Sequence, residues 1–233
     1  FYSKMKKFIK NFFLNKKNQM RPVQWGELRK VKPFSNIFGY DRGQSINRYY
    51  IENFLNHHKS SITGHVLEFG DNRYTTKYGQ EKILKSDVIH PTNENKEATI
   101  ISDIVQSDNI MDNSFDCIIC IQTLQFIFDF DQAIENLYRI LKPNGVLLCS
   151  MSGISQISRY DMERWGEYWR FTDASTKRIF EKYFNNECII TTYGNVLVAT
   201  AYLQGLSSHE LTADELDYND PDYQAFITVR AVK

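Results

Sequence analysis

The chain has 233 residues, with 28 acidic and 28 basic side chains, 42% hydrophobic residues and 24% charged residues. This composition is ordinary for a globular protein and excludes collagen-like, low-complexity and wholly disordered chains. The longest unbroken apolar run covers residues 117–121, far below the ~20 residues that a membrane-spanning helix needs. We therefore expect neither a transmembrane segment nor a signal peptide, and the few cysteines favour a reducing, cytoplasmic location.

The basic residues are unevenly distributed along the chain. Residues 1–32 carry ten Lys or Arg and one acid, so the remainder has an excess of nine acids. Within residues 1–17, apolar side chains recur at helical spacing between lysines, which predicts a basic amphipathic helix. Two roles stay open for it: peripheral contact with an anionic membrane or a partner, and packing as a connector. We expect an arm or linker over 1–32 and a single domain over 33–233.

Strand-like and helix-like patterns alternate through the rest of the chain. Helices are expected at residues 46–58, 130–141 and 176–184. Strands are expected at residues 65–70, 83–89, 98–101, 115–121, 146–149, 187–193 and 226–232, with turns at 143–145 and an acidic loop at 210–222. Because buried strands that alternate with helices form parallel sheets covered on both faces, we predict a doubly wound α/β fold.

In an open parallel sheet, the ligand crevice lies at the carboxyl ends of the strands. Polar residues or glycines follow five of the predicted strands, and each of them alone is also a common cap or turn residue. They are Glu68, Gly70 and Asp71, then His90, then Asp103, then Gln122 and Thr123, then residues 150–153. The predicted topology brings these positions together at one edge of the sheet.

These positions lie within a series of motifs. VLEFG at 66–70, the turn at Asp103, FDCIICIQTLQF at 115–126 and YRILKPNGVLLCS at 138–150 resemble the successive motifs of class I S-adenosylmethionine-dependent methyltransferases. The LKPNG turn is similar to that of the small-molecule methyltransferases loosely called type 11. Residues 39–55 and 154–172 resemble a bacterial subgroup often encoded with, or fused to, glycosyltransferases. The resemblance implies a Rossmann-like, seven-stranded, mostly parallel sheet with an antiparallel last strand, S-adenosylmethionine as cofactor, and a glycosyltransferase partner or fused domain.

The resemblance also implies cofactor-binding roles for individual residues. Glu68 and Gly70 fall on the first-strand acid and the first glycine of the loop that holds the methionine portion. Asp103 falls beside the adenine, with Ile104 packed on the ring, and Gln122 falls near the sulfonium.

Two departures from the family pattern concern the same loop and the next strand. Asn72 and Tyr74 replace the usual second and third glycines, and His90 stands where the family supplies a carboxylate for the ribose. A histidine makes one such hydrogen bond rather than a bidentate pair. The alternative is that Asp71 or Glu94 binds the ribose instead.

The segment after the fifth strand supplies the candidates for catalysis and acceptor binding. Asp161 and Glu163 are the candidate general bases that would activate an acceptor hydroxyl, and a solvated turn is the alternative. Aromatic rings and guanidinium groups suit stacking on sugars or pairing with anions, whereas packing or a lid is the alternative. The candidate acceptor-binding residues are Arg159, Tyr160, Trp165, Trp169 and Arg170.

The sequence leaves two hypotheses for function. One is an S-adenosylmethionine-dependent O-methyltransferase that acts on a sugar or glycan-related acceptor. The other is a catalytically weak, methyltransferase-like binding module that docks to a glycosyltransferase through residues 1–32. Nucleic-acid binding is disfavoured because the body of the chain is acidic. Cys117 and Cys120 form a C-x-x-C pair, but we expect no metal site because residues three apart on a strand face opposite sides.

Overall fold

The structure is a computed structural model that describes residues 23–185 and 187–233. The chain divides into two units, Phe1–Lys32 and Pro33–Lys233, which are considered separately. The predicted amphipathic helix at residues 1–17 lies outside the described residues. The described part of the first unit contains one short 3₁₀ turn, η2 (Gly26–Leu28).

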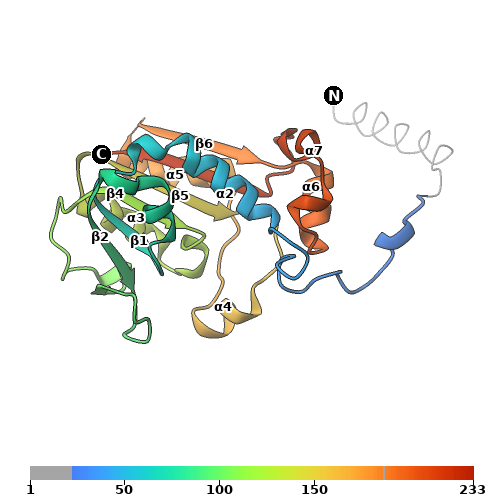
Figure 1. Cartoon of the computed structure of the whole chain (residues 1–233), viewed down its shortest axis with the longest axis horizontal. Coiled ribbons are helices and arrows are strands. Elements are labelled where there is room, and N and C mark those ends of the chain that lie inside the picture. Colours follow the sequence, from blue (N-terminus) through green and yellow to red (C-terminus); the bar gives the residue numbers. More distant parts are fainter. Residues whose placement is uncertain (1–22, 186) are drawn as a thin grey trace, which may run out of the picture. The chain divides into compact units, whose positions relative to one another are not determined.

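A seven-stranded sheet forms the centre of the second unit, in the order β3-β2-β1-β4-β5-β7-β6 (Figure 1). The first five strands in the chain run parallel to one another, and β7 is antiparallel to both β5 and β6. This arrangement confirms the predicted fold. The strands are β1 (Gly64–Phe69), β2 (Ile83–His90), β3 (Ile100–Ile101), β4 (Phe115–Ile121), β5 (Leu141–Ser152), β6 (Cys188–Tyr193) and β7 (Phe226–Val232).

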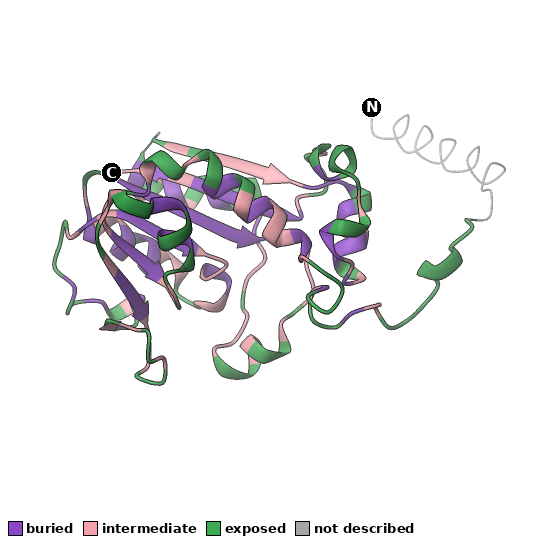
Figure 2. Cartoon of the chain, viewed as in Figure 1, coloured by how far each residue is buried: buried purple, intermediate pink, exposed green. Residues whose placement is uncertain are grey.

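Helices cover both faces of this sheet, and the buried residues lie between the layers (Figure 2). The α-helices are α2 (Ile46–His57), α3 (Phe130–Ile140), α4 (Arg159–Arg164), α5 (Asp173–Phe184), α6 (Val196–Leu203) and α7 (Ala213–Asp217). The short turns are η3 (Lys59–Ser61), the π-helical η4 (Thr75–Gly79), η5 (Gln80–Lys82), η6 (Ile104–Gln106), η7 (Leu124–Phe126) and η8 (Ser208–Glu210). Within the described residues, none of the helices combines the length and the apolar character required to cross a membrane.

Alternating side chains of the central strands supply two separate hydrophobic clusters. Cys120 belongs to the cluster that contains residues of α3 and α5, whereas Cys117 belongs to the cluster that contains residues of α2 and α6. The two thiols of the C-x-x-C pair are therefore on opposite faces of the sheet, as a period of two requires. Within the described residues, no group of three His, Cys, Asp or Glu side chains is placed to hold a metal ion.

Two segments differ from the sequence prediction. The turn expected at residues 143–145 lies inside β5, which begins at Leu141. Leu141 pairs with Phe115 of β4, and the register then shifts before Val146, with Asn144 at a φ of +66°, so the turn is an irregularity within the strand. The predicted acidic loop at 210–222 contains α7, because Thr212 and Glu215 form a capping box that starts a helix.

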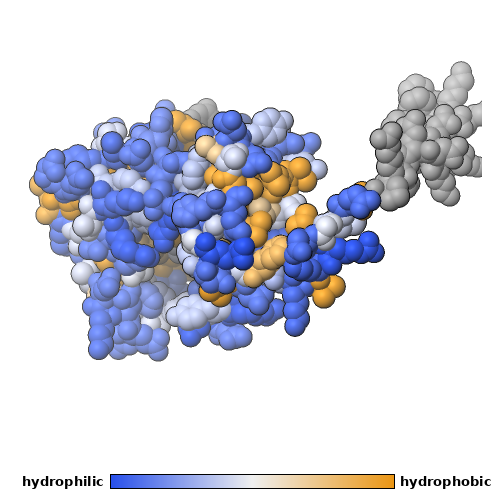
Figure 3. All heavy atoms as spheres, turned by 45° about the vertical axis from the view of Figure 1, so that its right-hand side comes forward, coloured by the Kyte–Doolittle hydropathy of each residue, from blue (hydrophilic) through white to orange (hydrophobic). Residues whose placement is uncertain are grey.

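Apolar side chains also gather on part of the outer surface (Figure 3). Helix α6 contributes to the exposed apolar surface through Val196, Leu197 and Leu203, which are 44–55% exposed. Its sequence, VLVATAYL, contains no charged residue. This surface is separate from the residues that line the cavities described next.

Candidate functional site

Two cavities open at the carboxyl ends of the central strands. One has a volume of about 630 Å³ and is called the α2 cavity, because Asn47, Arg48 and Ile51 of α2 line it. The other has a volume of about 570 Å³ and is called the β2 cavity, because Ile89 and His90 of β2 line it. Four residues line both cavities, so a ligand that extended from one cavity into the other would contact them. They are Phe69, Gln122, Phe126 and Asp161.

Glu68 lies at the end of β1 and lines the α2 cavity. Its carboxylate accepts hydrogen bonds from Tyr74 N (3.1 Å), Thr75 N (2.7 Å) and Thr75 Oγ1 (2.7 Å). Burial raises the pKa of Glu68 to about 7, against the opposing effect of these three donors. The side chain is 2% exposed. In this structure, the hydrogen bonds of Glu68 therefore hold the loop after β1. That Glu68 also contacts the cofactor is a proposal.

Gly70 begins that loop with a φ of +82°, a left-handed conformation that favours glycine. Its N–H donates to Ile89 O of β2 (3.1 Å), which fixes the turn against the neighbouring strand. A Cβ added at Gly70 would meet no atom within 4 Å. The backbone at Gly70 therefore borders open space in the β2 cavity, where a ligand can approach it closely.

Of the two residues that replace the expected glycines, Asn72 is exposed and lines neither cavity, whereas Tyr74 is buried. Tyr74 is 8% exposed and belongs to the cluster between α2 and the sheet. Its hydroxyl accepts a hydrogen bond from Arg48 Nη1, and Arg48 also lies 5.4 Å from the centre of its ring. Burial raises the pKa of Tyr74 to about 12. Asp71, which lines the α2 cavity, is held by Arg73 Nε (2.7 Å).

The polar residues after β2 and β3 line the β2 cavity. His90 Nδ1 lies 2.8 Å from Thr92 O, and the ring meets Trp165 edge to face at 5.5 Å. Asp103 caps η6 by accepting a hydrogen bond from Val105 N (2.9 Å). Ile104, which is 3% exposed, also lines this cavity. Glu94, the alternative residue for the ribose, is exposed and lines neither cavity.

Gln122 and Asp161 lie where the cavities meet. Gln122 adopts a φ of +50° directly after β4, and its N–H donates to Ser150 O of β5 (3.0 Å). Asp161 is in the first turn of α4, where Ser158 Oγ donates to its Oδ2 (2.6 Å). The structure therefore brings one candidate base to the point where the two cavities join.

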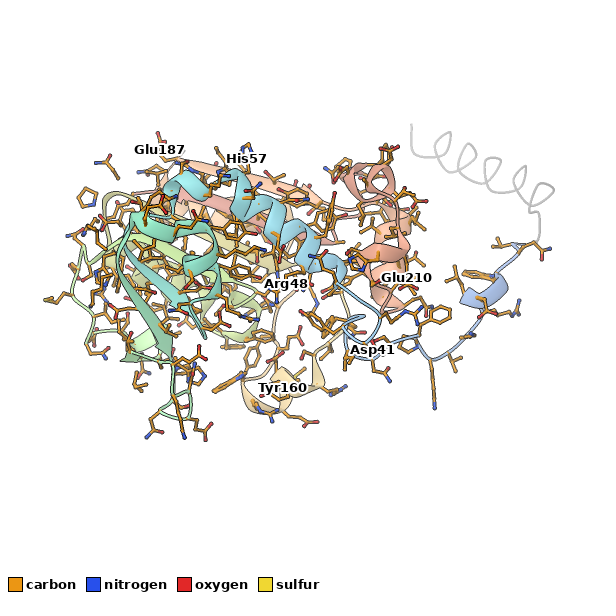
Figure 4. The ribbon with its side chains drawn as sticks, viewed as in Figure 1. Asp41, Arg48, His57, Tyr160, Glu187 and Glu210 are labelled. Atoms are coloured by element: carbon orange, nitrogen blue, oxygen red, sulfur yellow. The ribbon has the colours of Figure 1, made fainter. Side chains whose placement is uncertain are left out.

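The structure separates the other candidates from the segment after β5. Arg159 and Tyr160 line the α2 cavity, and Trp165 lines the β2 cavity. Figure 4 shows Tyr160 on α4 and Arg48 near the beginning of α2, and both residues line the α2 cavity. Glu163 is exposed and lines neither cavity, which does not fit a role as base.

Trp169 and Arg170, two of the predicted acceptor-binding residues, line neither cavity. Trp169 Nε1 donates to Ile127 O (3.0 Å), and its ring packs against Phe130 at 5.1 Å. Arg170 Nη2 lies 2.7 Å from Glu167 Oε1 and donates to Gln156 O (2.7 Å). Trp169 is therefore held by the chain at the start of α3, and Arg170 by the segment after β5.

The α2 cavity contains two polar residues that the sequence did not single out. The side chain of Glu167 is 3% exposed, and its Oε2 accepts a hydrogen bond from Ser158 N (2.7 Å). Gln125 of η7 is 2% exposed, and its Nε2 donates to Gln122 O (3.1 Å). Both residues occur among aromatic neighbours in the sequence, and their burial beside the cavity identifies them.

Comparison with known proteins gives one match to a family model. Residues 73–149 match a family model described as a methyltransferase domain. A search of curated proteins finds no match to the chain.

Solved structures share the fold at low sequence identity. A SAM-dependent methyltransferase from Archaeoglobus fulgidus matches with 12% identity and a TM-score of 0.54, covering 80% of this chain and 94% of that chain. The N-methyltransferase NodS from Bradyrhizobium japonicum, in complex with S-adenosyl-L-homocysteine, matches with 16% identity and a TM-score of 0.52, covering 89% and 94%. The cyclase SpnF matches with 15% identity and a TM-score of 0.54, covering 88% of each chain.

The family match and the fold support an S-adenosylmethionine-dependent methyltransferase of class I, with S-adenosylmethionine as its cofactor. The residues of the β2 cavity fit that cofactor. Ile89, Ile104 and Ile127 give the cavity apolar walls for a flat ring, while Asp103 and His90 bring polar groups. The open space beside the backbone of Gly70 allows the close approach that the resemblance requires there.

Proposed function

We propose that this protein transfers a methyl group from S-adenosylmethionine to a hydroxyl group of a sugar or glycan-related acceptor. The observation that carries the proposal is the junction of the two cavities, which both Gln122 and Asp161 line. In this assignment the adenosyl group occupies the β2 cavity and the acceptor occupies the α2 cavity. When bound, the cofactor supplies an activated methyl group on its sulfonium.

The residues of the β2 cavity bind and orient the cofactor. Asp103 and Ile104 border the adenine, and His90 makes a single hydrogen bond to the ribose. The Nδ1 atom of His90 is next to Thr92 O, so Nε2 is the nitrogen that faces a ligand in this proposal. Glu68 acts mainly by fixing the loop whose backbone borders the methionine portion.

Asp161 removes the proton from the acceptor hydroxyl. Ser158 Oγ holds Oδ2 of this carboxylate at 2.6 Å, which leaves Oδ1 to receive the proton. A hydroxyl is a poor nucleophile while it is protonated, so a positioned base adds about 10²- to 10⁴-fold to the rate. Alignment of the acceptor within the α2 cavity adds the effect of proximity.

Aromatic and polar side chains in the α2 cavity support a sugar as the acceptor. Tyr160 and Tyr40 line the cavity and are 66% and 53% exposed, so their rings are available for stacking on the face of a sugar. Asn36, Asn47 and Gln156 supply amide groups that can bind hydroxyls.

An amine acceptor is the nearest alternative, because the structural relative NodS is an N-methyltransferase. The product distinguishes the two. The full chain is incubated with S-adenosylmethionine and either methyl glycosides or the corresponding amino sugars, and the products are analysed by mass spectrometry. We expect a glycoside to gain one methyl group on oxygen. Methylation of the amino sugars alone, on nitrogen, would contradict the proposal.

The proposal includes a cytoplasmic location and a glycosyltransferase as partner or fused domain. Four free thiols at Cys117, Cys120, Cys149 and Cys188 support a reducing compartment.

The alternative hypothesis is a catalytically weak binding module, and the replacement of two glycines by Asn72 and Tyr74 is the reason for it. The Tyr74 side chain, however, packs beside α2 and leaves a cavity next to the loop. This geometry favours the enzyme.

A further inference from the structure

Three side-chain oxygens beside the α2 cavity have no hydrogen-bond partner among the described residues. They are Oδ1 of Asn47, Oε1 of Gln125 and Oγ of Ser155, and all three residues line that cavity. They come from three separate segments: α2, η7 and the chain that follows β5. Buried polar groups in folded proteins are nearly always paired, so three unpaired oxygens on residues that line one cavity require an explanation.

The orientation of the Gln125 amide is fixed by its neighbours. Its Nε2 donates to the backbone oxygen of Gln122 (3.1 Å) and to Gln122 Oε1 (3.2 Å). A carbonyl oxygen only accepts hydrogen bonds, so the nitrogen of Gln125 must face Gln122. Oε1 of Gln125 is therefore the atom without a partner, and it too can only accept a hydrogen bond.

The position of this group in the sheet favours the acceptor over the cofactor as its ligand. Gln125 follows β4, as the cofactor candidate Gln122 does, and Ser155 follows β5, whereas Gly70, His90 and Asp103 follow β1, β2 and β3. In the sheet, β5 and β2 lie on opposite sides of the β1–β4 pair. Ser155 thus lies on the side of the sheet away from the proposed adenosyl site, and Gln125 lies between the two.

We infer that Asn47, Gln125 and Ser155 form a polar subsite that accepts hydrogen bonds from at least two free hydroxyl groups of the acceptor. This inference rests on the proposed function. Two of the three oxygens are amide carbonyls, so the subsite selects ligand groups that donate. An acceptor whose corresponding hydroxyls are absent or already methylated leaves these oxygens unpaired and binds more weakly.

The test measures binding to the full chain saturated with S-adenosylhomocysteine. The probes are the methyl glycosides of glucose, galactose, mannose and rhamnose, titrated by calorimetry. We expect at least one glycoside to bind the wild-type protein and to bind Ser155→Ala about threefold to tenfold more weakly. Because Ser155 Oγ has no partner in the protein, its removal should not lower the melting temperature of the free protein. Gln125→Met is the second variant, with the same expected loss.

Thr176→Val is the matched control. Oγ1 of Thr176 is also buried without a partner, but Thr176 lies in α5 and lines neither cavity. This variant should bind the glycoside and S-adenosylhomocysteine as the wild type does. An equal loss of glycoside binding in Thr176→Val would contradict the proposed subsite.

S-adenosylhomocysteine and methylthioadenosine, which lacks the amino-acid portion, distinguish the cofactor from the acceptor. If Ser155→Ala weakens S-adenosylhomocysteine but not methylthioadenosine, the subsite binds the cofactor's ammonium group and the inference is overturned. It is also overturned if S-adenosylhomocysteine binds the wild type but none of the glycosides does, whereas the methyltransferase proposal then stands. Failure of S-adenosylhomocysteine itself to bind would overturn the proposed function.

Discussion

The β2 cavity and the α2 cavity differ in how their polar groups are satisfied. In the β2 cavity, His90 and Asp103 are each paired with the backbone of the turn that follows their own strand. In the α2 cavity, Asn47, Gln125 and Ser155 keep oxygens without partners. The polar groups of the β2 cavity are held by local turns, and we propose that this cavity binds S-adenosylmethionine, a cofactor common to many proteins. The α2 cavity retains unpaired groups that only a particular ligand satisfies.

Asp161 belongs to both cavities, so its replacement is the strongest way to separate binding from chemistry. Asp161→Asn keeps the shape of the side chain but removes the base. We expect kcat to fall by about 10²-fold or more, with the affinity for S-adenosylhomocysteine changed less than about twofold. Steady-state kinetics and calorimetry measure the two quantities.

Glu163→Gln is the control for that experiment, since Glu163 is exposed two residues away and lines neither cavity. Its turnover should equal that of the wild type. Unchanged turnover in Asp161→Asn, or an equal loss in both variants, would reject Asp161 as the base.

Gly70 tests the β2 cavity alone. Gly70→Val places a side chain in the open space beside the loop and strains a backbone with a φ of +82°. We expect the affinity for S-adenosylhomocysteine to fall at least about tenfold, and the free energy of unfolding to fall by about 1–2 kcal/mol. Calorimetry and denaturant unfolding check the two parts, and undiminished affinity would place the cofactor elsewhere.

Glu68 gives the loop a pH-dependent stability. Since burial raises its pKa to about 7, the folded chain holds a proton that the unfolded chain loses near pH 4.5. This contribution to stability is complete below about pH 4.5 and is lost as the pH rises to about 7, with a slope of up to ~1.4 kcal/mol per pH unit. Urea unfolding across this range should show the slope in the wild type and not in Glu68→Gln. Parallel curves for the two proteins would refute the assignment.

Trp169 is expected to have the smallest effect, and it separates packing from acceptor binding. Trp169→Phe removes the Nε1 donor to Ile127 O and keeps an aromatic ring beside Phe130. The free energy of unfolding should fall by about 1 kcal/mol, while KM for the acceptor stays the same. A rise in KM without a loss of stability would instead support Trp169 as an acceptor-binding residue.

The difference between the β2 cavity and the α2 cavity also explains which features the sequence could predict. The positions of the strands along the chain, and turn residues such as Gly70 and Asp103, follow from local patterns. A turn after a buried strand is determined by a few neighbouring residues, so the sequence is enough to place it. The α2 cavity depends on contacts between distant segments, such as the hydrogen bond from Tyr168 N to Gln125 O (2.8 Å). Trp169 and Tyr160 look equivalent in sequence, but one is tied to the chain near Ile127 and the other is exposed. No local pattern distinguishes them.

Calorimetric titration of the full chain with S-adenosylhomocysteine tests the central claim most directly. The account predicts binding at a single site in the wild type, weakened by Gly70→Val and preserved in Thr176→Val. The absence of heat and of any thermal shift at millimolar concentrations of S-adenosylhomocysteine would contradict it.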